Sequence, residues 1–157
     1  MASLAGHPGT HVKTHGALGN ACADDDMLAD AVARGIRAAD PGLAFMVMPG
    51  TATERAADRL GLRAIREVYA DRTYDDSFNL TSRGVEGAVI HDVETALARV
   101  IEMVAGARLE SVTGKRLPVA IDTVCVHGDN PAAVAMAKAL RSGLEDAGWT
   151  VSPAKAG

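Results

Sequence analysis

Residues 43–69 read LAFMVMPGTATERAADRLGLRAIREVY, and this stretch decides the fold class. Its first six residues form a continuous apolar run of the kind found in strands that are buried on both faces of a sheet. Thr51 and Glu54 then have the spacing of a capping box, which predicts a helix that ends near Gly61. The last six residues predict a second strand. Strand, helix and strand in so short a segment indicate parallel strands joined by a helical crossover.

The same alternation extends outward in both directions. Upstream, a strand is predicted over 11–14 and a helix from the acids at 24–26 to Asp40. Downstream, the pattern predicts a polar loop over 71–87, a helix over 92–106, a hairpin over 109–119 that turns at Thr113-Gly114, a strand over 122–126, a helix from Asn130 to Gly148, and a last short strand over 150–152.

These elements predict an α/β fold of mainly parallel strands with a small hairpin insertion. A complete barrel of this class needs about 250 residues. The 157 residues of the chain therefore predict either an open sheet or part of a barrel, built as a single domain over residues 1–157.

The composition excludes several classes of function. A formal net charge of −4 gives no reason to expect a basic patch for phosphates, so we expect no nucleic-acid partner. No apolar stretch approaches the roughly 20 residues that span a bilayer, so we expect no membrane. Residues 1–8 lack the basic and apolar segments of a signal peptide. Two cysteines in such a chain, Cys22 and Cys125, predict reduced thiols and a cytoplasmic protein.

Polar residues follow three of the predicted strands. His15 follows the first strand, Asp71 and Arg72 follow the third, and His127 and Asp129 follow the last long one. Because the carboxyl ends of parallel strands lie on one rim of the sheet, functional groups collect there. The sequence therefore predicts that these side chains form one site.

The run His127-Gly128-Asp129-Asn130-Pro131 is the most informative of these segments. Its glycine allows a ligand to approach the backbone, and the helix that begins at Asn130 points its free N–H groups toward the same place, which suits a carboxylate or a phosphate. The alternative is that Asp129 or Asn130 only caps the helix and that His127 bonds a loop. The residues alone leave both interpretations open.

Four basic residues have a similar double interpretation. Lys13 and His15 lie two residues apart at a strand end, so both can face one side, with a charge for anionic oxygens and an imidazole for proton transfer. The alternative is a solvated lysine and a structural histidine. Arg72 or Arg83 can clamp a carboxylate through its fork of donors, or can form an ordinary surface contact.

Other residues and motifs carry weaker signals. Glu67 alternates with Val68, so it can point into the interior of the sheet or barrel, where an acid needs a partner. Cys125 lies in an apolar strand, which predicts a buried core thiol. No phosphate-binding loop occurs, because the glycine that should precede Thr113-Gly114-Lys115 is missing. The histidines form no spaced cluster, so we predict no metal site; the alternative is that the fold brings His15, His127 and Asp129 together as ligands.

Four segments, in order along the chain, resemble motifs of the LamB/YcsF family. Residues 11–20 (HVKTHGALGN) resemble VKPHGALYN, residues 67–74 (EVYADRTY) resemble EVFADRxY, residues 80–90 (LTSRGVEGAVI) resemble LVPRSxPGAVI, and residues 124–131 (VCVHGDNP) resemble ICVHGDNP. The departures are Thr14 for proline, Gly19 for tyrosine, Ser82 for proline and Gly84 for serine. The family's DLNxDxGE and CGFHAGDP motifs have no counterpart here. We therefore expect the chain to correspond to the larger, C-terminal part of a LamB/YcsF barrel.

The resemblance implies a seven-fold (β/α) barrel of the kind found in glycoside hydrolases and deacetylases. It also implies a 5-oxoprolinase that opens 5-oxo-L-proline to L-glutamate together with B and C subunits. ATP is then a co-substrate, with a divalent metal such as Mg possible beside it. The implied catalytic residues are His15, Asp71, His127 and Asp129, and the implied substrate or phosphate ligands are Lys13, Arg72, Arg83 and Asn130. One alternative is an inactive remnant that still docks its partners, and another is a metal-dependent hydrolase of the deacetylase type.

Overall fold

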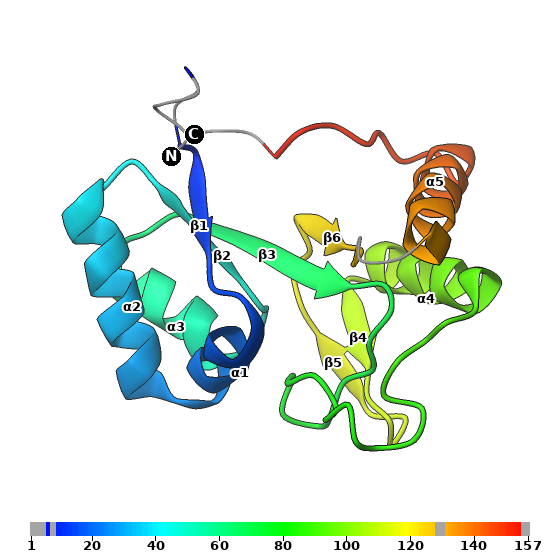
Figure 1. Cartoon of the computed structure of the whole chain (residues 1–157), viewed down its shortest axis with the longest axis horizontal. Helices are drawn as coiled ribbons and strands as arrows, with labels where there is room; N and C mark the ends of the chain where they lie inside the picture. The colour runs from blue at the N-terminus through cyan, green and yellow to red at the C-terminus, as the bar shows by residue number, and fades with distance from the viewer. Residues whose placement is uncertain (1–5, 7–8, 128–130, 155–157) are drawn as a thin grey trace. The chain divides into compact units, whose positions relative to one another are not determined.

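The computed structural model describes residues 6, 9–127 and 131–154. These residues divide into two compact units, and the boundary lies inside one strand, between Arg66 and Glu67. We call the residues up to Arg66 the N-terminal unit and Glu67–Ala154 the C-terminal unit. Each unit has its own hydrophobic core. Figure 1 labels the elements of both. A single domain over residues 1–157 stays a prediction.

The N-terminal unit contains three parallel strand segments and three helices. Its elements are β1 (His11–Lys13), α1 (Gly16–Asp24), α2 (Asp26–Ala39), β2 (Ala44–Val47), α3 (Ala52–Leu60) and the first half of β3 (Ala64–Tyr69). β2 pairs in parallel with both neighbours, so Phe45 lies opposite Val12 of β1 and Ala64 of β3. Phe45 and Val47 form the core of this unit with small side chains from α2 and α3. The predicted parallel pairing is confirmed.

The helix ends of the N-terminal unit follow the predicted signals with one difference. Asp25 caps α2, because its carboxylate accepts from the Met27 and Leu28 amides at 2.8 and 3.1 Å. Gly61 ends α3 in the left-handed conformation, with φ 64°. Thr51 and Glu54 do not form the predicted capping box, because the Glu54 carboxylate instead accepts from the Gly50 amide at 2.7 Å. Helix α1 was not predicted.

The C-terminal unit begins with the second half of β3. It continues through α4 (Val93–Gly106), β4 (Arg108–Glu110), β5 (Arg116–Pro118), β6 (Thr123–Cys125) and α5 (Pro131–Asp146). β6 runs parallel to β3, and β4 and β5 form an antiparallel hairpin whose turn contains Gly114 at φ 82°. The α/β class, the mainly parallel strands and the hairpin are confirmed. The strand predicted over 150–152 is wrong, because these described residues lie in no strand.

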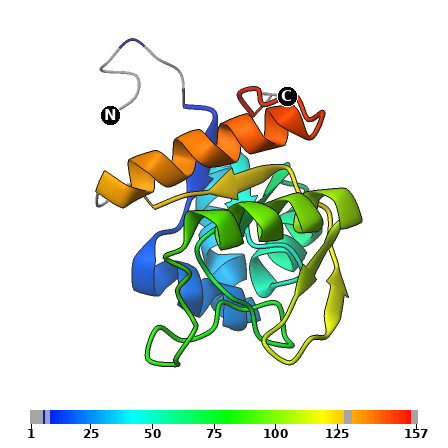
Figure 2. The ribbon, with the colours of Figure 1, turned by 90° about the vertical axis from the view of Figure 1, so that its right-hand side faces the viewer.

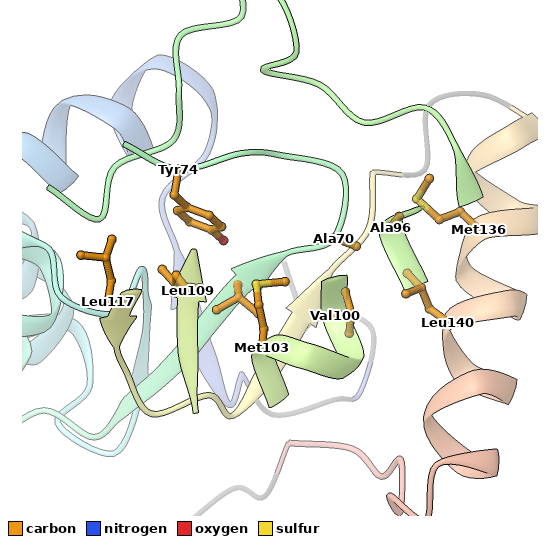
Figure 3. Packing of buried hydrophobic residues seen from close by; sticks show 10 residues of the cluster. Ala70, Tyr74, Ala96, Val100, Met103, Leu109, Leu117, Met136 and Leu140 are labelled. Atoms are coloured by element: carbon orange, nitrogen blue, oxygen red, sulfur yellow. The ribbon is translucent and has the colours of Figure 1, made fainter. Parts of the chain in front are cut away.

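The core of the C-terminal unit surrounds Tyr74, which is fully buried. Figure 3 shows Tyr74 over the hairpin residues Leu109 and Leu117, with side chains of α4 and α5 farther along. Helix α5 packs against α4 (Figure 2). Their contact is so close that a Cβ atom on Gly143 of α5 would lie 2.5 Å from the Leu97 side chain of α4.

The parallel strands have open edges within the described residues, where β1 pairs with β2 alone and β6 pairs with β3 alone. The described strands therefore do not close into a barrel. None of the described helices combines the length and the apolar character that crossing a bilayer requires.

Candidate active site

Successive residues of β3 point alternately to two different faces in the C-terminal unit. Val68 and Ala70 are 0% exposed and belong to the core. Because side chains alternate along a strand, Glu67 and Tyr69 point to the opposite face, and Asp71 follows them at the same spacing. This second face therefore carries two carboxylates with a phenol between them.

Strand β6 repeats this division beside β3. Val124 and the following Val126 pack against the core. Thr123 and Cys125 lie opposite Glu67 and Tyr69 in the parallel register, so they share the polar face. The prediction of a core thiol is wrong, because Cys125 is half-buried and lies outside the core cluster.

Asp71 and His127 meet where these two strands end. The Nδ1 atom of His127 lies 2.5 Å from Oδ2 of Asp71, and the side chains are 33% and 14% exposed. The other Asp71 oxygen, Oδ1, is buried and has no hydrogen-bond partner among the described residues. With Asp71 ionised, Nδ1–H donates to the carboxylate and leaves Nε2 as a proton acceptor. An imidazole oriented in this way by a carboxylate can act as a general base.

Tyr69 lies against this dyad. Its ring centroid is 5.9 Å from that of the imidazole, and the two planes are inclined by 31°. Glu67, only 6% exposed, accepts a hydrogen bond from the Tyr69 phenol. Burial, followed by the negative charge of Glu67, raises the pKa of Tyr69, so the phenol stays protonated.

Arg72 holds the loop that follows β3. It is 5% exposed, and it donates from Nη2 to the Thr81 carbonyl at 2.6 Å and from Nε to the Ala88 carbonyl at 3.3 Å. Burial, followed by the positive charge of nearby Arg83, lowers the pKa of Arg72. Arg99 of α4 donates to the Arg72 carbonyl at 3.2 Å. The backbone around Asp71 is therefore fixed from several sides.

The other residues predicted for the site do not belong to the contacts around Asp71 and His127 described above. Arg83 is exposed in the same loop of the C-terminal unit. Lys13 ends β1 and is half-buried, and His15 is exposed at the N-cap of α1, where its side chain forms no capping hydrogen bond; both belong to the N-terminal unit. Asp129 and Asn130 lie outside the described residues.

Of the predicted residues, the structure thus brings Asp71 and His127 into direct contact. It adds Tyr69, which was not predicted as a site residue. The polar and apolar alternation of EVYAD was the signal for it, because that alternation places Tyr69 between Glu67 and Asp71 on one face. Within the described ranges, no group of three or more His, Cys, Asp or Glu side chains is arranged to hold a metal ion.

Comparison with known proteins identifies the family. The chain matches the LamB/YcsF family over residues 1–157. It is 47% identical over 155 residues to a protein of Nitrobacter hamburgensis that is named as the A-type subunit of 5-oxoprolinase, and this match covers 99% of this chain and 61% of the relative. It is 50% identical to the protein of the same name from Rhodopseudomonas palustris (strain BisB5), with 98% and 60% covered.

A solved structure agrees with these relatives. The crystal structure of the lactam utilization protein from Thermus thermophilus superposes with a TM-score of 0.82 at 39% identity, and the match covers 93% of this chain and 58% of that chain. The chain thus spans about three fifths of the length of the relatives it matches. From the match over its whole length and from these similarities, the chain belongs to the LamB/YcsF family.

Proposed function

We propose that this chain acts as the A-type component of a 5-oxoprolinase, which opens 5-oxo-L-proline to L-glutamate with hydrolysis of ATP and together with B and C subunits. The names of the relatives support this proposal, since 5-oxoproline is a lactam. The observation that carries it is the contact between His127 Nδ1 and Asp71 Oδ2, because a hydrolysis needs a group that takes a proton from water. A cytoplasmic location agrees with the two free cysteines, Cys22 and Cys125.

The chemistry explains the need for ATP. An unstrained lactam carbonyl is a poor electrophile, and transfer of the terminal phosphoryl group of ATP to its oxygen activates the carbon. His127 Nε2 then takes a proton from the attacking water, while Asp71 stabilises the imidazolium. The same proton passes to the ring nitrogen as the carbon–nitrogen bond breaks. This cleavage leaves the side-chain carboxyl as an acyl phosphate, and a second water then displaces the phosphate, so that one ATP and two waters give L-glutamate, ADP and phosphate.

The other residues fit roles of charge and position. Arg83 is exposed, so we assign the substrate carboxylate to it and assign to Arg72 the role of holding the loop. We propose Lys13, His15, Asp129 and Asn130 for the phosphoryl oxygens and the proton transfers around them. Mg²⁺ would then enter with ATP as its phosphate complex.

The test is glutamate release from 5-oxoproline and ATP by the full chain mixed with B and C subunits. We expect glutamate and phosphate in equal amounts, and we expect His127→Ala to abolish both. His11→Ala is the matched control, since it removes an exposed imidazole from β1, and it should keep normal turnover. Normal turnover by His127→Ala would refute the mechanism. Binding of the B and C subunits without any glutamate release by the unchanged chain would refute the enzymatic role and favour a purely docking role.

A further inference from the structure

We propose that Tyr69 is a positioning residue for the dyad: its ring holds the plane of the His127 imidazole, and Glu67 anchors that ring through its hydroxyl. The expected effect of Tyr69 on turnover rests on the proposed 5-oxoprolinase function, whereas the contact between the Tyr69 and His127 rings does not.

The imidazole of His127 needs a second support. Its side chain is 33% exposed and its described hydrogen bond is to Asp71. One hydrogen bond at Nδ1 fixes the direction of that atom, but it leaves the ring free to swing about the bond. A ring contact on the imidazole face removes this freedom.

Tyr69 is placed to supply that contact. The centroid distance of 5.9 Å and the inclination of 31° lie in the range in which aromatic rings attract one another. A cation over the face of a phenol ring and within about 6 Å of its centre is attracted by it, and the 5.9 Å between the centroids lies within that distance for the imidazolium that forms when His127 takes a proton. The contact therefore supports both protonation states that general-base catalysis requires.

Glu67 explains why Tyr69 stays in this position. Glu67 lies two residues before Tyr69 on the same face of β3 and is 6% exposed. A carboxylate this deeply buried needs hydrogen bonds, and the Tyr69 phenol donates one. The bond ties the far end of the phenol to the strand that carries it. Glu67, Tyr69 and Asp71 thus form a continuous row beside His127.

The spectroscopic test uses the full chain labelled with ¹⁵N in its histidines. We expect a signal from the His127 Nδ1 proton, protected from exchange by its bond to Asp71 and identified by its loss in His127→Ala. Tyr69→Phe retains the ring and should retain the signal. Tyr69→Leu removes the ring and should lose the signal to exchange, with the rest of the spectrum unchanged.

The kinetic test uses the chain with B and C subunits. Because misplacing a catalytic group by about 1 Å costs about 100-fold in rate, we expect Tyr69→Leu to lower kcat by about 10- to 100-fold with KM nearly unchanged. Tyr69→Phe should stay within about threefold of the unchanged chain, since the ring contact is worth more than the anchor.

Two results would overturn the inference. One is a Tyr69→Leu chain that keeps the protected Nδ1 proton of His127. The other is a Tyr69→Phe chain that loses as much signal and as much kcat as Tyr69→Leu, since the ring would then not matter. If the unchanged chain releases no glutamate, the proposed function fails, and the protected proton alone decides the role of Tyr69. If Tyr69→Leu unfolds, Tyr69→Met takes its place as a larger side chain without a ring: loss of the protected signal supports the inference, and a retained signal refutes it.

Discussion

Replacing Tyr74 with phenylalanine removes a single oxygen atom that connects the core of the C-terminal unit to the candidate site. The Tyr74 hydroxyl accepts a hydrogen bond from the Tyr69 amide at 2.7 Å, and Tyr74 is 0% exposed. The next amide, that of Ala70, donates to Cys125 of β6 at 3.1 Å. Since successive amides of a strand point to opposite sides, the Tyr74 side chain takes the place of a neighbouring strand at Tyr69.

The size of the effect follows from this geometry. Phenylalanine keeps the ring, so the core loses almost no volume and no cavity term applies. The Tyr69 amide, however, loses its acceptor beside a side chain that is 0% exposed, and leaving such a donor unsatisfied costs about 1 to 3 kcal/mol. We therefore expect the free energy of unfolding to fall by about 1 to 3 kcal/mol in Tyr74→Phe.

Urea unfolding followed by circular dichroism measures this loss, and amide hydrogen exchange locates it. We expect exchange at the Tyr69 amide to accelerate by about tenfold or more, because about 1.4 kcal/mol corresponds to a factor of ten. Exchange at Ala70 should change less. The control is Thr150→Val, which removes an exposed hydroxyl and should leave stability unchanged. Unchanged exchange at Tyr69 in Tyr74→Phe would refute the reasoning.

Three further predictions concern the dyad, the helices and the response to pH. Asp71→Asn should lower glutamate release by about 100-fold or more with partner binding intact, because the amide cannot stabilise the imidazolium; normal kinetics would contradict this. In thermal unfolding, Gly143→Ala should destabilise the chain by about 1 to 3 kcal/mol, because the new Cβ would lie 2.5 Å from the Leu97 side chain. Gly35→Ala should instead stabilise it by about 0.5 to 1 kcal/mol, because a Cβ on Gly35 of α2 would meet no atom within 4 Å and alanine favours the helix. Hydrogen bonds from two hydroxyls of the hairpin turn lower the pKa of Asp76. The ionised Asp76 carboxylate should therefore stabilise the fold fully above the ordinary aspartate pKa, and this stabilisation should be lost as the pH falls through the lowered pKa. Asp76→Asn lacks this carboxylate, so denaturation measured from pH 7 to pH 2 should show a smaller loss of stability in acid for Asp76→Asn than for the unchanged chain.

The strands and most helix ends could be predicted because their causes are local. An apolar run followed by Pro49-Gly50 is enough to end β2, and Asp92 caps α4 through its own carboxylate at 2.7 Å from the Thr95 amide. Helix α1 could not be found in this way. Its sequence, GALGNACAD, contains two glycines and buries only Cys22 and Ala23, so it shows little apolar periodicity.

The end of α4 shows a similar limit. Gly106 predicted the end of the helix, but the left-handed residue is Ala107, at φ 46°. Gly106 instead leaves room for the Arg108 side chain, which a Cβ atom would meet at 2.5 Å. A glycine near a helix end thus predicts the end well, but its own role depends on a neighbour that the pattern does not reveal.

For the candidate site, the sequence predicted Asp71 and His127 but neither Tyr69 nor the contacts among these side chains. Asp71 and His127 follow strands, and the rim of a parallel sheet brings such residues together. Their direct bond depends on the register of β3 against β6, which pairs Tyr69 with Cys125. That register also decides that Cys125 faces the polar side. The sequence of one strand alone cannot reveal which residue of another strand lies opposite.

The segment EVYADRTY combines two sets of residues that alternate along the chain. Glu67, Tyr69 and Asp71 form the polar row beside His127, whereas Val68 and Ala70 lie in the core. The second set continues after the strand, since Arg72 is buried against loop carbonyls and Tyr74 is buried in the core.

This division assigns a role to each residue by its position. A general base acts only if it stays within a fraction of an ångström of its place, so the dyad requires a rigid backbone beneath it. The even-numbered residues provide that rigidity by burial and by hydrogen bonds to the loop, and the odd-numbered ones carry the groups that can meet a substrate. Arg72 belongs to the even set, and its guanidinium is already engaged by the Thr81 and Ala88 carbonyls. Arg83 is exposed in the loop that Arg72 holds, and for this reason we propose Arg83 and not Arg72 as the ligand of the substrate carboxylate.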